Sequence, residues 1–177
     1  MDPLPAVAII GKQYSRAVSD LLRLAEYDIF VSCFLFQDGS VFGKQLIAEL
    51  SDAALRGVAV QVFLNQRLSG GVSVRHIHSL KTVFENCGIA VHFWGKGQVL
   101  HSKLFIVDSR YIIIGSHNVS DRCLTHNIET SIFLDDEKVA KTFLDFFVAP
   151  DLQHSPGFDQ VSHNLNVARL KARLGLD

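Results

Sequence analysis

Residues 101–118 of the chain read HSKLFIVDSRYIIIGSHN. Two short, mostly apolar runs in this stretch, Lys103–Val107 and Tyr111–Ile114, are rich in the branched and aromatic residues that favour strands. The three residues between them, Asp108–Arg110, are typical of a turn. Because so short a turn joins antiparallel neighbours, the stretch predicts an antiparallel pair of buried strands.

On both sides of this pair, helical and strand-like segments alternate. Apolar residues recur at helical spacing in several segments, and Gly57 and Gly88 follow two of them as C-terminal caps. Helices are expected at Tyr14–Glu26, Val41–Arg56, Val74–Cys87 and Asp135–Phe147, and further strands at Asp28–Phe36, Val58–Leu64, Ile89–Trp94 and Ile128–Leu134. This alternation predicts an α/β fold with a mixed, mostly parallel central sheet flanked by helices on both faces.

Length and composition fit one compact domain. The chain has 177 residues, of which 48% are hydrophobic and 20% charged. Its 17 Lys and Arg are balanced by 18 Asp and Glu, so it lacks the bulk positive charge of a protein that coats nucleic acid. We assign residues 1–150 to the domain, and expect residues 151–177 to form a loop and a final basic helix at Asn164–Leu174 that packs on it or extends it.

Polar side chains stand at the ends of the two central strands. His101 and Lys103 are two residues apart, so on a strand they point to the same face. Burying an unpaired lysine is costly, and an anion held between the two side chains would remove that cost. The second strand is followed directly by Gly115–Asn118, whose small and amide residues can donate hydrogen bonds to phosphate oxygens.

Taken together, these residues resemble the signature of the phospholipase D superfamily. That signature is His-x-Lys, four residues, Asp, six residues, then Gly-Ser-x-Asn, and the chain matches it without a departure in spacing from His101 to Asn118. Glu129 stands where the family has a further glutamate on the next strand. The resemblance covers roughly residues 14–148 and implies a phospholipase D-like fold.

The resemblance also implies a covalent mechanism of phosphodiester cleavage. His101 would attack phosphorus and form a phosphohistidine, while Lys103 and Asn118 would hold the nonbridging oxygens. Glu129 would hold the other ring N–H of the histidine and so fix its tautomer.

Three further residues of the signature have supporting roles. Ser116 is expected to hydrogen-bond within the site and to contact substrate. His117 occupies the free position of the signature, and we include it among the residues that bind substrate. Asp108 belongs to the catalytic signature, but we expect it to support the turn, Lys103 or the backbone rather than touch the substrate.

A second histidine must protonate the leaving oxygen and then activate water, and the family takes it from a second copy of the motif. His-x-Lys occurs once in this chain. A homodimer with its twofold axis through the active site is the simplest solution. The family needs no metal, and the three cysteines, Cys33, Cys87 and Cys123, form no zinc-binding pattern, so neither a metal nor another cofactor is expected.

The signature indicates the reaction but not the substrate. A nuclease acting on DNA or RNA is favoured, because small single-motif members of the family resemble metal-independent endonucleases. The first alternative is a phospholipase D-type hydrolase of a lipid such as cardiolipin, and the second is an inactive nucleic-acid-binding or scaffold member. The sequence shows no signal peptide and no apolar run of the roughly 20 residues that span a bilayer, so we expect a cytoplasmic protein without stable membrane association.

Overall fold

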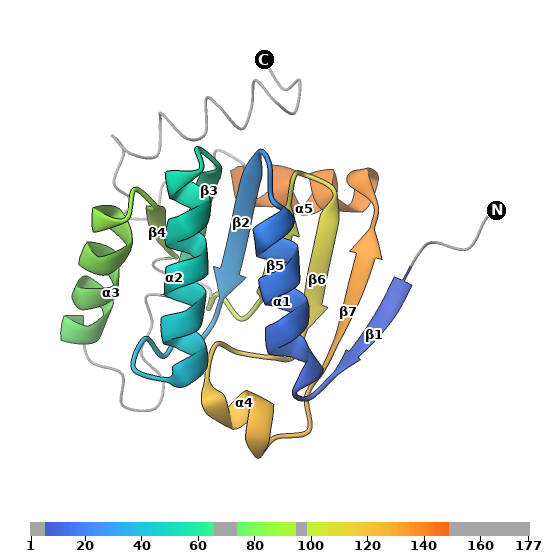
Figure 1. Cartoon of the computed structure of the whole chain (residues 1–177), viewed down its shortest axis with the longest axis horizontal. Helices are drawn as coiled ribbons and strands as arrows, with labels where there is room; N and C mark the ends of the chain where they lie inside the picture. The colour runs from blue at the N-terminus through green and yellow to red at the C-terminus, as the bar shows by residue number, and fades with distance from the viewer. Residues whose placement is uncertain (1–5, 66–73, 95–98, 149–177) are drawn as a thin grey trace.

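The computed structural model of the protein describes residues 6–65, 74–94 and 99–148 (Figure 1). These ranges contain β1 (Ala6–Ile10), α1 (Gln13–Leu24), β2 (Asp28–Cys33), α2 (Val41–Leu55), β3 (Ala59–Asn65), α3 (Val74–Asn86), β4 (Ala90–Trp94), β5 (Lys103–Val107), β6 (Tyr111–Gly115), α4 (Asp121–Thr125), β7 (Thr130–Asp135) and α5 (Glu137–Val148). The predicted domain boundary at residue 150 and the predicted helix Asn164–Leu174 lie outside the described residues.

The described strands form one seven-stranded sheet in the order β1-β7-β6-β5-β2-β3-β4. β2 pairs in parallel with β3, and β3 with β4, whereas the other four pairs are antiparallel, including the β5–β6 pair. The predicted mixed sheet is therefore confirmed. Contrary to the expectation, parallel pairs do not predominate. Five strands, β1, β2, β3, β4 and β6, run in one direction, but β5 and β7 run against them. β1 and β6 therefore have no parallel neighbour.

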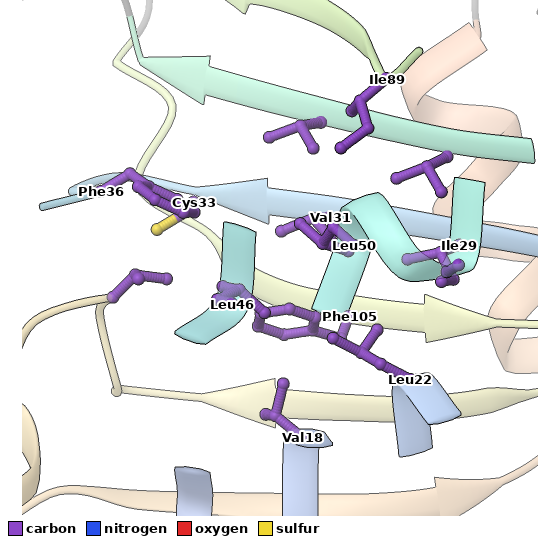
Figure 2. Packing of buried hydrophobic residues seen from close by; sticks show 14 of the residues in the cluster. Val18, Leu22, Ile29, Val31, Cys33, Phe36, Leu46, Leu50, Ile89 and Phe105 are labelled. Atoms are coloured by element: carbon purple, nitrogen blue, oxygen red, sulfur yellow. The ribbon is translucent and has the colours of Figure 1, made fainter. Parts of the chain in front are cut away.

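Helices cover both faces of the sheet, as predicted. α1, α2 and α3 lie on one face and α5 lies on the other (Figure 1). The first face is packed by Val18, Leu22, Leu46, Leu50, Ile29, Val31 and Phe105, all of which are buried (Figure 2). On the opposite face, Leu144 and Phe147 of α5 pack near Phe30. Because strand side chains alternate between faces, the sheet can be apolar on both sides.

Two elements were not predicted from the sequence. β1 is an edge strand that pairs only with β7 among the described strands, and four of its five residues are exposed. Because the strand is mostly exposed, its sequence AVAII lacks the alternation of apolar and polar residues that identifies a strand with one buried face. α4 has five residues, which is too short to show a helical period. Two predicted helix ends are confirmed: Gly57 and Gly88 have φ of +91° and +75°, a conformation that glycine adopts at little cost.

Candidate active site

The signature residues come together at the edge of the sheet where β2 and β6 end and β5 and β7 begin. This is the edge next to α4 in Figure 1. A cleft of about 410 Å³ opens there and is lined by His101, Ser102, Lys103, Ile114, Gly115, Ser116 and Asn118. The antiparallel β5–β6 pair produces this arrangement, because it places the start of β5 beside the end of β6. Four of the predicted site residues, His101, Lys103, Ser116 and Asn118, therefore line one cleft.

His101 and Lys103 are in direct contact. Lys103 Nζ lies 3.0 Å from His101 Nδ1 and 2.6 Å from the His101 carbonyl oxygen. Lys103 is only 7% exposed, and its burial lowers the pKa of the ammonium group, while the nearby Glu129 acts in the opposite direction. A protonated lysine has no lone pair, so in this contact Nδ1 must accept the hydrogen bond. The neutral His101 ring then carries its proton on Nε2.

Phe34, which was not predicted as a site residue, contacts both members of this pair. Its ring centroid lies 4.4 Å from that of His101, with 44° between the planes, and 5.1 Å from Lys103 Nζ. It follows the last residue of β2 and is half-buried. The sequence shows it only as one more apolar residue of a strand, so no pattern distinguishes it from the core phenylalanines.

Glu129 belongs to a separate network beside the cleft. Its two carboxylate oxygens accept hydrogen bonds from Ser116 Oγ and from Asn127 Nδ2, the latter at 2.9 Å. Burial acts to raise the pKa of Glu129, but the hydrogen bonds from Ser116 and Asn127, together with contributions from Cys123 and His117, lower it overall. The expected hydrogen bond between Glu129 and His101 is absent from the described residues of the single chain: Glu129 binds Ser116, and the Nδ1 atom of His101 faces Lys103.

Asn118 and Gly115 shape the opposite wall of the cleft. The Oδ1 atom of Asn118 accepts a hydrogen bond of 3.3 Å from the backbone N–H of Leu35, so its amide N–H₂ is the group that can bind a phosphate oxygen. A Cβ atom at Gly115 would come within 2.3 Å of both Ser131 Oγ and the Thr130 carbonyl oxygen. The glycine of the signature is therefore required by the close approach of β6 to β7.

Asp108 lies at the opposite end of β5 from the cleft. Its carboxylate accepts hydrogen bonds from the backbone N–H groups of Glu26, Tyr27 and Asp28, the shortest being 2.7 Å. These contacts fasten the β5–β6 turn to the start of β2. Asp108 lies five residues along the chain from Lys103, which lines the cleft, and this corresponds to about 16 Å at the usual rise per residue. The geometry agrees with a structural role for Asp108 and leaves no room for contact with a substrate bound at His101.

His117 points away from the cleft into the core. It is 1% exposed, its ring stacks on Tyr14 at 4.1 Å, and Nδ1 lies 2.8 Å from Ser131 Oγ. Burial lowers the pKa of its imidazole, while Glu129 acts to raise it. In this position His117 cannot touch a substrate in the cleft, so the binding role predicted for it would require the side chain to move.

A larger hollow of about 800 Å³ lies at the other end of the sheet, beneath α1. Its lining is mainly apolar and includes Leu21, Tyr27 and Phe133, and Asp108 is the one signature residue that borders it. It contains the cation Arg110 but no histidine, so it lacks the nucleophile that the cleft at His101 provides. In the described part of the chain, no three His, Cys, Asp or Glu side chains cluster so as to hold a metal ion, and no helix combines the length and apolarity needed to cross a membrane.

Comparison with known proteins extends the similarity beyond the signature. A protein-family model described as "Cardiolipin synthase, PLD-like domain" matches residues 18–149. A cardiolipin synthase of Clostridium perfringens (strain 13) is 25% identical over 140 residues, which cover 77% of this chain and 28% of that protein. A cardiolipin synthase of Halalkalibacterium halodurans is 30% identical over 112 residues, covering 63% of this chain and 22% of that protein. The chain thus spans about a quarter of the length of these relatives.

Solved structures match the fold over most of the chain. Nuc, a phospholipase D family member from Salmonella typhimurium, is similar with a TM-score of 0.68 at 21% identity, covering 85% of this chain and 95% of the Nuc chain. NucT from Helicobacter pylori has a TM-score of 0.66 at 16% identity, covering 86% of this chain and 97% of that chain. The helices, the mixed sheet and their order are therefore those of an established fold.

Proposed function

The chain belongs to the phospholipase D-like family, and from that premise we propose that it cleaves phosphodiester bonds with His101 as the nucleophile. The observation that carries the proposal is the cleft itself. A histidine and a buried lysine in contact there face a serine hydroxyl and an amide, which together suit a tetrahedral anion. The reaction type follows from these groups, since a ring nitrogen can attack phosphorus while cationic and amide donors stabilise the charge that develops.

The first step would form a bond between a ring nitrogen of His101 and phosphorus and break the bond to the leaving oxygen. Lys103 and Asn118 would bind the nonbridging oxygens, which draws the ammonium away from His101 Nδ1. The ring proton could then move to Nδ1 and leave a lone pair on Nε2 for attack. In the second step water would attack phosphorus and release His101.

A group that gives a proton to the leaving oxygen and later takes one from water is still needed. Of the other histidines whose side chains the structure describes, His92 and His117 are buried, and His126 does not line the cleft. We propose that His101 of a second copy supplies this group in a homodimer whose twofold axis passes through the cleft. The two chains would then place two equivalent sets of groups around one phosphorus, one set from each chain.

Two classes of diester compete as the substrate. Nucleic acid is supported by the single motif of the chain, because small single-motif members of the family resemble metal-independent endonucleases. Phospholipid is supported by the sequence comparisons, in which the matching family and the curated relatives are cardiolipin synthases. We retain the nuclease as the first proposal and the lipid hydrolase as its rival.

The decisive experiment offers both classes to the same protein. Single-stranded DNA, duplex DNA, RNA and cardiolipin vesicles would each be incubated with the chain in excess EDTA, with the His101→Ala variant as the control. We expect cleavage of one class by the wild type and a loss of at least about 10³-fold in the variant, because the covalent route is then closed. Cleavage that disappears in EDTA would refute the metal-free mechanism, and an active His101→Ala variant would refute the nucleophile.

A further inference from the structure

We propose that Phe34 is a positioning residue of this site, whose ring holds the His101 imidazole and the Lys103 ammonium in one fixed arrangement. The inference rests on the proposed function, because it assigns a role to Phe34 within that cleft. Two contacts carry it: the Phe34 and His101 rings are 4.4 Å apart, and Lys103 Nζ lies 5.1 Å from the Phe34 centroid. Both polar groups thus lie against one aromatic side chain.

The backbone holds this ring in register with the pair. The N–H of Phe34 donates a hydrogen bond of 3.1 Å to the carbonyl oxygen of Ser102, the residue between His101 and Lys103. One residue earlier, Cys33 is the ladder partner of Lys103 in the β2–β5 pair. The paired segments therefore fix the backbone of Phe34 relative to that of His101 and Lys103, and their side chains start from positions in register.

The ring can do for this pair what a polar neighbour could not. An aromatic face stabilises the ammonium form of a lysine. Unlike a carboxylate, the ring carries no negative charge that would compete with the substrate anion for the lysine. The same ring restricts the orientations of the His101 imidazole by ring-to-ring contact. Phe34 would therefore favour a charged lysine and an aligned nucleophile in a site that still has a net attraction for phosphate.

Two substitutions separate this role from simple packing. Phe34→Leu keeps apolar cover but removes the aromatic face, whereas Phe34→Tyr keeps the face. Turnover of the activated diester bis(4-nitrophenyl) phosphate would be measured against pH in the full chain. We expect Phe34→Leu to lower kcat about tenfold with a smaller effect on KM, since aromatic and cation–π contacts are each worth a factor of several, and Phe34→Tyr to stay within about twofold of wild type.

The alkaline limb of the pH profile is the second readout. Without the aromatic face the ammonium form of Lys103 is less favoured, so the limb should move to lower pH in Phe34→Leu only. The other titratable groups that act on Lys103 are unchanged in both variants: His101, whose Nδ1 contacts the ammonium, and Cys33, Glu129 and Cys123. The matched control is Phe133→Leu, which removes another half-buried ring, one that stacks on Tyr111 and does not line the cleft; it should lower stability but not kcat.

A readout that needs no turnover distinguishes failure of this inference from failure of the proposed function. The ring of Phe34 should shift the proton resonances of the His101 ring, and this shift should vanish in Phe34→Leu and persist in Phe34→Tyr. Identical His101 resonances in wild type and Phe34→Leu, or equal kcat values in the two, would overturn the positioning role. A wild type that turns over no diester but shows the ring-dependent shift would refute the catalytic proposal and leave the contact between the rings intact.

Discussion

In the single chain, His101 and Lys103 are bonded to each other rather than poised for attack. The ammonium of Lys103 donates to Nδ1 at 3.0 Å, which places the proton of the neutral imidazole on Nε2. Glu129, the group expected to hold the other ring N–H and so fix the tautomer, is bound instead to Ser116 and Asn127. An anion in the cleft would compete for the ammonium, so the binding of a phosphate and the tautomer of the proposed nucleophile would be coupled through one lysine.

This coupling predicts a change of tautomer on anion binding. In ¹⁵N NMR spectra at about pH 8, where ordinary histidines are neutral, the free protein should show His101 protonated on Nε2. Saturating inorganic phosphate should shift the population toward Nδ1–H, because a hydrogen bond from a charged donor is worth about 1.5–3 kcal/mol, which corresponds to about 10- to 150-fold in population. Lys103→Met should abolish the phosphate response. A free protein already protonated on Nδ1 would contradict the arrangement.

The residues of the cleft could be predicted from sequence because the signature fixes both their chemical type and their place at strand ends. Their partners could not, because these depend on tertiary packing. Nothing in the spacing shows that the carboxylate of Glu129 accepts from Ser116, or that Phe34 covers Lys103. His117 illustrates the same limit: it follows an exposed serine at a strand end, yet it turns inward and stacks on Tyr14.

Among the elements, the β5–β6 turn contains the signature residue Asp108, whose contacts are structural and link the turn to β2. Asp108 and the following Ser109 both have φ of +52°, and the Asp108 carboxylate accepts three backbone N–H groups at the start of β2. The turn therefore holds three strands at the end of the sheet away from the cleft.

Replacing this carboxylate should cost stability rather than catalysis. We expect Asp108→Ala to lower the free energy of unfolding by about 1–3 kcal/mol, because it removes the acceptor of three backbone N–H groups, of which that of Asp28 belongs to a buried residue, and puts alanine at a positive φ. Asp108→Asn retains one acceptor oxygen and tolerates that φ, so its loss should be smaller. Urea unfolding would measure both, beside kcat per folded molecule. A large fall in kcat at unchanged stability would instead assign Asp108 to the reaction.

The order of the strands could not be obtained from the sequence for a physical reason. Periodicity predicts where a strand lies, but β5 inserts beside β2, about 70 residues earlier in the chain, and this long-range pairing makes the sheet more antiparallel than the alternation of helices and strands suggests. Local signals were sufficient for the helices that end at glycine and for the β5–β6 pair. They were insufficient for β1, whose pairing with β7 joins the two ends of the described chain.

At the scale of the whole molecule, two apolar side chains that neighbour signature residues in the sequence are exposed. Ile128 is 97% exposed directly before Glu129, and Val99 is 47% exposed two residues before His101. If the site is shared between two copies as we propose, these exposed apolar groups are the ones that the contact would bury. In a twofold arrangement each such residue is buried twice, once in each chain, so their contribution to association is doubled.

This symmetry makes Ile128→Lys a sharp test of the shared site. Burial of one isoleucine side chain contributes roughly 1.5–3 kcal/mol, so losing two and bringing two lysines together should raise the dissociation constant of the dimer by about 100-fold or more. Activity at low protein concentration should fall in parallel, because each chain would hold half of the catalytic groups.

Leu55→Lys is the matched control: Leu55 is 85% exposed at the end of α2, and α2 ends at the opposite edge of the sheet from α4 (Figure 1). Sedimentation velocity and diester turnover would be measured over the same concentration series. An Ile128→Lys monomer that retains full turnover per chain would rule out the shared site, and the general acid would then have to come from the chain itself.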